Sequence, residues 1–181
     1  LAALGLSRPH MPYKGLIMSI LISPMIVPLI ITAAGMFFFY AKINLVYTFT
    51  GIILAHIALS TPFVVITVTA TLVGFDMNMV KASQSLGAKP MRTFFKVIMP
   101  LILPGVISGA LFAFITSFDE VVIVMFMASL DQLTIPKQMW AGIRQEISPV
   151  ILCMATCLVI LSIFLLTTVE LLRRRSEKLR G

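Results

Sequence analysis

Two adjacent carboxylates are the residues of this chain that most require a chemical explanation. Asp119 and Glu120 interrupt an apolar run that begins at Gly105 and resumes at Val121. If a helix from Gly105 stays regular, they lie roughly 21–23 Å along it. Carboxylates at such depth are costly and usually face a protein interior or an aqueous path. Asp119 or Glu120 therefore either attracts a cationic group, or forms an ion pair or helix cap with a partner subunit. Side chains at adjacent helix positions point about 100° apart, so we do not expect the two carboxylates to share one function.

Few other side chains could take part in catalysis or in binding. His56 lies within another apolar run, where it either hydrogen-bonds to a neighbouring helix or contacts a solute. Cys153 and Cys157 lie four residues apart within a further apolar run. Thiols in such a run are most simply small buried hydrophobic side chains, rather than metal ligands or redox groups. No nucleophile–base arrangement or metal-ligand spacing emerges from the two His and two Cys. We therefore expect a non-catalytic chain without a metal site or cofactor of its own.

The composition indicates what kind of structure must position these residues. The chain is 59% hydrophobic and 12% charged, whereas a soluble domain usually carries about 25% charged residues. The sequence therefore predicts an all-α integral membrane protein in contact with lipid. The net charge of +7 could suggest nucleic acid, but the basic residues gather beside the apolar runs, where they anchor topology. We expect no nucleic-acid partner.

Four apolar runs are long enough to cross a hydrocarbon core of about 30 Å at about 1.5 Å per residue. They are Leu16–Tyr40, Val46–Val73, Gly105–Ala128 and Val150–Leu172. Pro24 and Pro28 are expected to bend or break the first run. The predicted architecture is a polytopic helical bundle forming a single transmembrane domain over residues 1–181. Because the chain opens at Leu1 without a signal-like segment, we expect further N-terminal helices to be missing.

The basic residues predict an orientation for these spans. The last span ends at a run of three arginines, and placing this end in the cytoplasm leaves only Lys42, Lys137 and Arg144 of the 14 Lys and Arg residues outside. An excess of Lys and Arg in cytoplasmic loops is the usual rule for membrane proteins. The predicted location is the inner (plasma) membrane, multi-pass, with a cytoplasmic C-terminus.

The segment Gly74–Pro104 is predicted to be a structured cytoplasmic loop. Asp76 can cap a short helix, Gly87 can close it in the left-handed conformation, and Pro90 prevents its continuation. These three residues predict a helix of roughly 10 residues, then a sharp turn at the glycine, and then a second helix. Without further information, this pattern also fits an ordinary basic connector between two spans.

Residues 129–149 are predicted to form the main extracytoplasmic loop, with a short amphipathic helix at its centre. Trp140 is the only tryptophan of the chain, and Arg144 follows it by four residues. Trp140 either anchors the helix at the membrane interface or, with Arg144, contacts an extracytoplasmic binding protein.

The loop at 74–104 resembles the signature loop of the permease subunits of binding-protein-dependent ABC importers. That signature reads E-A-A, three residues, G, nine residues, I-x-L-P. This chain keeps the spacing with Lys81-Ala82-Ser83, Gly87 and Val97-Ile98-Met99-Pro100. Ala82, Gly87 and Pro100 match by identity, whereas Lys81 replaces Glu, Ser83 replaces Ala, Val97 replaces Ile and Met99 replaces Leu.

The C-terminal half carries a more specific resemblance. The stretches 117–121 (SFDEV), Met139-Trp140 and 143–149 (IRQEISP) are similar to the second permease subunit of spermidine/putrescine-type importers. The resemblance implies that Lys81, Ala82, Ser83, Gly87 and Pro100 couple the chain to a cytoplasmic ATPase. It also implies a homologous second permease and an extracytoplasmic substrate-binding protein. ATP and Mg²⁺ would bind to the ATPase partner, and this chain has no G-x-x-x-x-G-K-[ST] phosphate loop of its own.

The expected function is therefore that of a permease subunit of an ATP-driven importer, with a polyamine such as spermidine or putrescine as solute. Asp119 and Glu120 are the expected residues of the solute path. Three alternatives stay open: another small solute in the same importer class, a fragment of an ion-gradient-driven transporter using His56 and Asp119, and a membrane scaffold that docks a cytoplasmic protein.

Overall fold

The computed structural model describes residues 2–8, 10–145 and 149–178, and these residues form helices joined by short turns. The helices are α1 (Ala2–Leu6), α2 (Lys14–Ile26), α3 (Leu29–Lys42), α4 (Phe49–Val73), α5 (Asn78–Ser85), α6 (Pro90–Thr93), the π-helical turn η1 (Phe94–Ile98), α7 (Met99–Phe118), α8 (Val122–Met127), α9 (Ile135–Gln145) and α10 (Pro149–Lys178). No strand occurs among the described residues. The all-α prediction is confirmed.

Three continuous helices of the described chain are long and apolar enough to cross a membrane. They cover Phe49–Val73, Pro90–Phe118 and Pro149–Thr168. The first predicted span is instead a pair of helices, α2 and α3, bent by 105° at the break between them. Pro28 lies at this break, immediately before α3, whereas Pro24 lies inside α2 without ending it. The prediction that proline breaks this run is confirmed at Pro28.

The third predicted span, Gly105–Ala128, has different boundaries in the structure. Its helix begins at Pro90 and ends at Phe118. The expectation of one regular helix through Asp119 and Glu120 is therefore wrong. The physical reason is local, because the Glu120 carboxylate accepts a hydrogen bond from the Ile123 N–H and so caps the next helix, α8.

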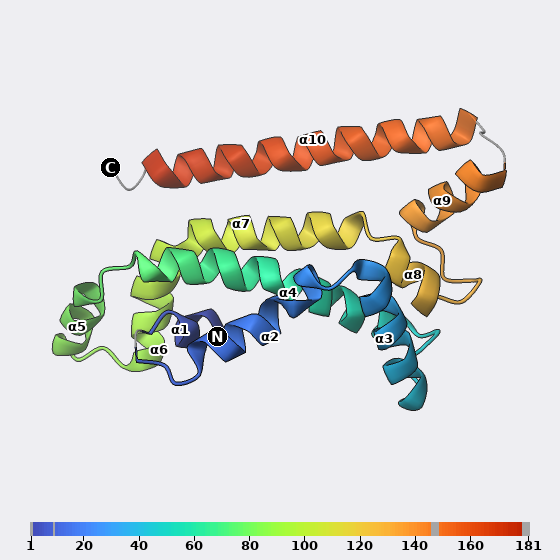
Figure 1. Ribbon diagram of the computed structural model, residues 1–181. Helices are drawn as coiled ribbons and strands as arrows, with labels where there is room; N and C mark the ends of the chain where they lie inside the picture. The colour runs from blue at the N-terminus through green and yellow to red at the C-terminus, as the bar shows by residue number, and fades with distance from the viewer. Residues whose placement is uncertain (1, 9, 146–148, 179–181) are drawn as a thin grey trace.

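Helices α4 and α7 lie side by side and antiparallel, and α1, α2, α8 and α10 contact one or the other of them (Figure 1). One apolar cluster joins α3, α4 and α8 through buried residues that include Ala55, Ile123 and Met127. A second cluster joins α1, α4 and α7 through residues that include Val68 and Ile102. Between α6 and α7 the helix turns through η1, and Pro100 lies in the turn of α7 that follows (Figure 1).

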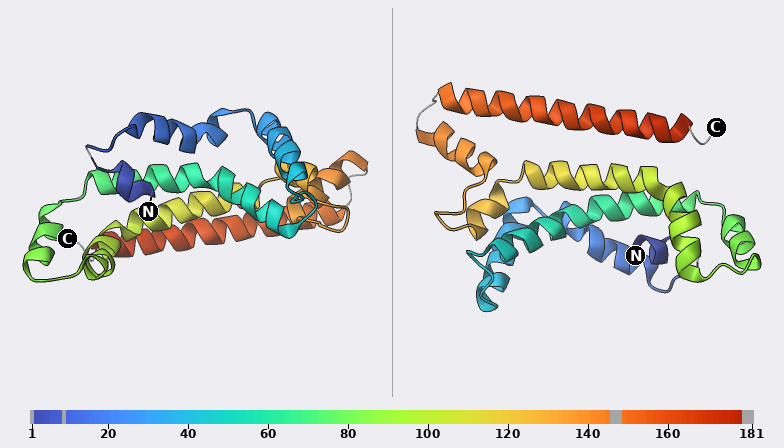
Figure 2. Two further views of the ribbon diagram at one scale, coloured as in Figure 1. Left: turned by 90° about the horizontal axis from the view of Figure 1, so that it is seen from below. Right: turned by 180° about the vertical axis from the view of Figure 1, so that it is seen from behind.

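The outer surface of the bundle is strongly apolar. Helix α10 runs alongside α7, and none of its membrane-length window is buried (Figure 2). Apolar side chains exposed in this way require lipid or a further protein subunit around them. The C-terminal end of α10 lies at the same end of the bundle as α5, and α8 and α9 lie at the other end (Figures 1 and 2).

Candidate functional site

The short helix α5 belongs to the segment between the two central helices, residues 74–98, which we call the hook. The Asp76 carboxylate accepts a hydrogen bond of 2.9 Å from the Asn78 N–H at the start of this helix. At its end the Gly87 N–H donates to the Gln84 carbonyl, and Gly87 has φ +77°. Pro90 then begins α6. The helix, glycine turn and second helix predicted from the sequence are confirmed.

Helix α5 is tied to the base of the hook by a hydroxyl pair. Ser83 Oγ lies 3.0 Å from Thr93 Oγ1 of α6, and Thr93 is buried. Lys81 and Ala82, the neighbours of Ser83 in the signature match, are exposed. The hook therefore holds α5 through its inner face and presents its outer face to solvent.

The structure brings four of the five predicted coupling residues together. Lys81, Ala82 and Ser83 lie on α5, and Gly87 closes its C-terminal turn. Pro100 lies on another element, at the second position of α7 beyond η1. Its ring removes a backbone N–H near the bend and so supports the change of direction there.

The central helices α4 and α7 approach each other closely at two glycines. A side chain at Gly105 would overlap Thr71, and one at Gly109 would overlap Thr67. These glycines form a G-x-x-x-G pattern, which permits close packing of spanning helices. The sequence reasoning missed this contact, although the spacing of Gly105 and Gly109 was a sufficient signal for it.

Two polar contacts join the same helices near the end of α7. His56 Nδ1 lies 2.8 Å from Ser117 Oγ, and Ser60 Oγ donates to the Ala113 carbonyl at 3.1 Å. The hydrogen bond expected between His56 and a neighbouring helix is confirmed. Its other nitrogen, Nε2, is buried and has no hydrogen-bond partner among the described residues.

The two carboxylates that follow have different surroundings. Glu120 is 7% exposed, and its Oε1 accepts a 2.8 Å hydrogen bond from the Ile123 N–H. Asp119 ends α7 and is exposed. The different surroundings are in keeping with the expectation that the two carboxylates have different functions, which stays a prediction. Glu120 thus caps a helix of its own chain, a role that neither alternative from the sequence described.

The loop after α8 is held by one hydrogen bond to the turn before α4 and by another from the start of α9. The Gln132 side chain donates to the Tyr47 carbonyl, and Lys137 Nζ donates to the Ser129 carbonyl at 3.0 Å. Helix α9 is the predicted amphipathic helix, and Trp140 on it is half exposed. Arg144 belongs to the backbone of α9, but its side chain falls outside the described part of the chain.

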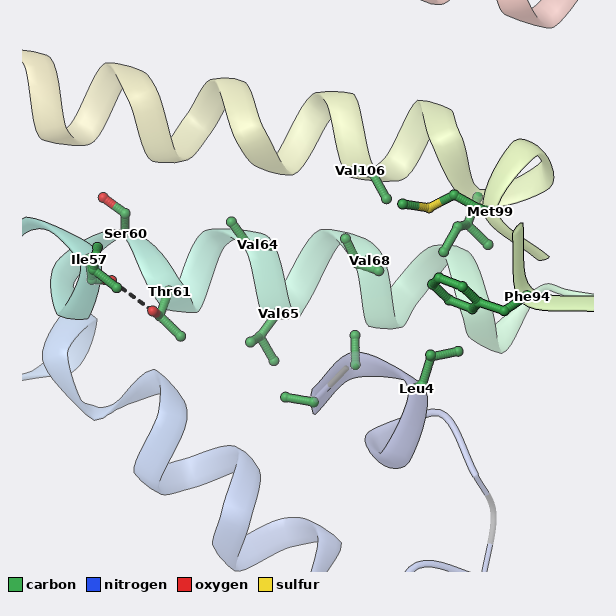
Figure 3. A pocket seen from close by; sticks show the side chains of 13 residues that line it. Leu4, Ile57, Ser60, Thr61, Val64, Val65, Val68, Phe94, Met99 and Val106 are labelled. Carbon is green, nitrogen blue, oxygen red and sulfur yellow. Dashed lines mark hydrogen bonds between the residues drawn. The ribbon is translucent and has the colours of Figure 1, made fainter. Parts of the chain in front are cut away.

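A separate hollow of about 530 Å³ lies between α1, α4 and the bend into α7. Figure 3 shows three valines of α4 in its walls, together with Leu4, Phe94 and Met99. The Thr61 hydroxyl at its edge donates to the Ile57 carbonyl of its own helix. Because no charged side chain of the described part of the chain lines this hollow, it does not fit a cationic solute.

No group of three or more His, Cys, Asp or Glu residues is placed to hold a metal ion within the described ranges. Cys153 and Cys157 are both free and exposed on α10, whereas the sequence predicted small buried hydrophobes. That expectation is wrong for this chain taken alone, because the described residues bury none of the membrane-length window of α10.

The family model described as "Binding-protein-dependent transport system inner membrane component" matches residues 1–178. The chain belongs to this family. Membership agrees with the multiple apolar helices of the bundle and identifies the chain as a multi-pass component of the inner membrane. The resemblance recognised from the signature loop is thereby confirmed.

Individual relatives and one solved structure agree with the family. The spermidine/putrescine transport system permease protein PotC of Haemophilus influenzae is 29% identical over 177 residues, which cover 98% of this chain and 69% of the relative. The putrescine transport system permease protein PotI of Escherichia coli strain K12 is 34% identical over 103 residues, or 57% of this chain and 37% of that protein. A chain of the inward-facing MetNI methionine ABC transporter matches with a TM-score of 0.74 at 18% identity, covering 97% of this chain and 84% of that chain. This likeness confirms the helical permease fold.

Proposed function

We propose that this chain is the membrane-spanning permease subunit of an ATP-driven, binding-protein-dependent importer. The observation that carries the proposal is the position of α5, an exposed helix that follows α4 and leads through α6 and η1 into α7, the two helices that pack tightly at the centre of the bundle. A protein that moves α5 thereby moves the central pair of the bundle. The chain itself catalyses no reaction in this proposal, and ATP with Mg²⁺ binds to a cytoplasmic ATPase partner.

The proposed orientation places α5 and the C-terminal end of α10 in the cytoplasm. Both lie at the same end of the bundle, and both carry basic residues (Figure 1). An excess of basic residues on one side favours this orientation. Helix α9 then lies outside, where the half-exposed Trp140 is available to the substrate-binding protein, and we propose Arg144 of the same helix as a second contact.

The proposed mechanism is alternating access. Closure of two ATPase subunits on ATP pushes α5, and the α4–α7 pair turns against a homologous second permease so that the path opens outward. The binding protein then releases its solute into the path. ATP hydrolysis and product release restore the inward-facing state. Gly105 and Gly109 support this transmission because close packing makes α4 and α7 move together.

The proposed solute is a polyamine such as spermidine or putrescine. The names of the PotC and PotI relatives support this class. An exposed carboxylate at the end of a spanning helix is suited to attract an organic cation. Asp119 is exposed in this way, whereas the Glu120 carboxylate already accepts a hydrogen bond from the Ile123 N–H. We therefore assign the solute contact to Asp119 rather than to Glu120.

The test is ATP-dependent uptake of labelled spermidine and putrescine by the subunit assembled with its partners in proteoliposomes. The proposal predicts uptake that Asp119→Asn reduces while ATPase activity is retained. Gly87→Arg serves as the control for lost coupling, since it should remove both uptake and stimulated ATPase activity. An assembled complex with active ATPase but no polyamine uptake would retain the importer class and overturn the solute. Uptake that continues without ATP would overturn the importer itself.

A further inference from the structure

The end of α7 is fixed to α4 by two polar contacts that lie one turn apart. His56 Nδ1 lies 2.8 Å from Ser117 Oγ, and the Ser60 hydroxyl donates to the Ala113 carbonyl at 3.1 Å. The two contacting positions are four residues apart on each helix, which is about one helical turn. Two contacts at this spacing define both the rotation and the height of the last turns of α7 relative to α4, which one contact does not.

Packing alone does not hold the final turn of α7. A hollow of about 350 Å³ lies beside the contact of His56 with Ser117, and both of these side chains line it. Its other walls come from isoleucines of α4 and from Thr134. Side chains next to an unfilled space lack the packing contacts that would otherwise hold them. The hydrogen bond to His56 is therefore what fixes Ser117 in place.

Asp119 follows this anchored turn directly. Its N–H donates to the Ile115 carbonyl at 3.1 Å, so the backbone of Asp119 still continues the last turn of α7. After it, the Glu120 carboxylate caps α8, and Ile123 of α8 packs in the apolar cluster that includes α4. Asp119 thus lies in a short joint between two segments that are both held against α4. The direction of its exposed side chain follows from the rotation of the last turn of α7.

The two ring nitrogens of His56 have unequal surroundings. Nδ1 contacts Ser117, whereas Nε2 is buried and finds no hydrogen-bond partner in the part of the chain that the structure describes. A buried polar atom without a partner costs stability, and an apolar side chain of similar size would fill the same space without this cost. Positions at which a sequence accepts such a cost are characteristically functional.

We propose that His56 is a positioning residue for solute recognition: by holding Ser117 it fixes the last turn of α7, and thereby the direction of the Asp119 carboxylate. This role rests on the proposed function, in which Asp119 contacts the polyamine. His56 itself does not touch the solute. A hydrogen bond from an ammonium group weakens steeply with distance and angle, and a displacement of about 1 Å is enough to impair a binding geometry. The effect of His56 therefore depends on the carboxylate of Asp119.

The experiment measures uptake of labelled putrescine and spermidine together with ATP hydrolysis, in proteoliposomes that hold the assembled complex and receive loaded binding protein. The result is expressed as solute taken up per ATP hydrolysed. The variants are His56→Leu, His56→Asn, His56→Gln and Ser117→Ala, each alone and combined with Asp119→Asn. Asparagine places its amide nitrogen or oxygen near the position of Nδ1, whereas glutamine places it near that of Nε2. Thr61→Val is the control on α4, since the Thr61 hydroxyl bonds within its own helix.

We expect His56→Leu and Ser117→Ala each to lower uptake per ATP by about fivefold, because the carboxylate is no longer directed at the solute. His56→Asn should retain at least about half of the wild-type value, whereas His56→Gln should resemble His56→Leu. In the Asp119→Asn background, His56→Leu should cause no further reduction, because two residues that act through one contact are not additive. A purely structural role of His56 would instead lower the value equally in both backgrounds.

The outcomes separate this role from the proposed function. A complex that hydrolyses ATP but takes up no polyamine, or that is unaffected by Asp119→Asn, overturns the proposed solute contact and the role of His56 with it. If Asp119→Asn reduces uptake per ATP while His56→Leu has no effect, or the same effect in both backgrounds, only the role of His56 is overturned. If His56→Leu does not assemble, Ser117→Ala with and without Asp119→Asn decides the same question.

Discussion

Gly109 of α7 lies directly against Thr67 of α4, with no room between them for a side chain. Thr67 directs its hydroxyl to the Phe63 carbonyl of its own helix, so the contact is a close approach of two helices rather than a bond. The same relationship recurs one turn away at Gly105 and Thr71. The two contacts fix how near the central helices lie.

Replacing Gly109 by Val should therefore separate α4 and α7. We expect a loss of about 1–3 kcal/mol in the free energy of unfolding, the usual cost of overpacking. Thermal unfolding of the purified complex in detergent measures this loss. Gly35→Ala is the matched control, because nothing lies within 4 Å of the added group, and alanine in a helix should add about 0.5–1 kcal/mol. Equal stability of Gly109→Val and wild type would contradict the close packing.

The contact of His56 with Ser117 should have a measurable coupling energy. We expect the double-mutant cycle of His56→Ala and Ser117→Ala to give about 0.5–1.5 kcal/mol, in the range for hydrogen bonds between spanning helices. Unfolding in a denaturing detergent provides the four free energies. Thr61→Val is the control, since its exposed hydroxyl bonds within its own helix. Additive effects of the two alanine substitutions would show that the bond contributes nothing to helix association.

Substitution of the two carboxylates should separate a structural role from a transport role. Glu120→Ala removes the cap of α8 and should cost about 1–2 kcal/mol of stability, whereas Glu120→Gln keeps an acceptor and should cost less. Asp119→Asn should change stability by less than about 0.5 kcal/mol, because Asp119 is exposed. Thermal unfolding and polyamine uptake are measured on the same preparations. The assignment is wrong if Asp119→Asn unfolds the protein or if Glu120→Ala leaves stability unchanged.

The turn at Gly87 should tolerate few substitutions. Its φ of +77° costs a β-branched residue about 1–2 kcal/mol locally, while asparagine adopts this region more readily. Gly87→Val should therefore displace α5 and reduce co-purification of the ATPase, and Gly87→Asn should largely retain it. Space is not the cause, because nothing lies within 4 Å of the added Cβ atom. Full ATPase binding by Gly87→Val would show that the turn does not position the docking helix.

Much of the architecture followed from the sequence alone. Apolar length predicted the spanning segments, and Asp76, Gly87 and Pro90 predicted the hook around α5. These features depend on local physics: transfer of apolar residues into a bilayer, and the dihedral preferences of glycine and proline. For the same reason the break at Pro28 was predictable, although its angle of 105° was not.

Tertiary structure alone decided the contacts of the polar residues. Whether Asp119 and Glu120 continued the helix depended on whether a backbone N–H was close enough to be capped, and Ile123 supplies it. The partner of His56 lies 61 positions away, on a helix whose register is set by the contacts of Gly105 and Gly109. Hydropathy and spacing give the length and the faces of each helix. Which face meets which neighbour depends on shape complementarity between helices, and that information is spread over both partners.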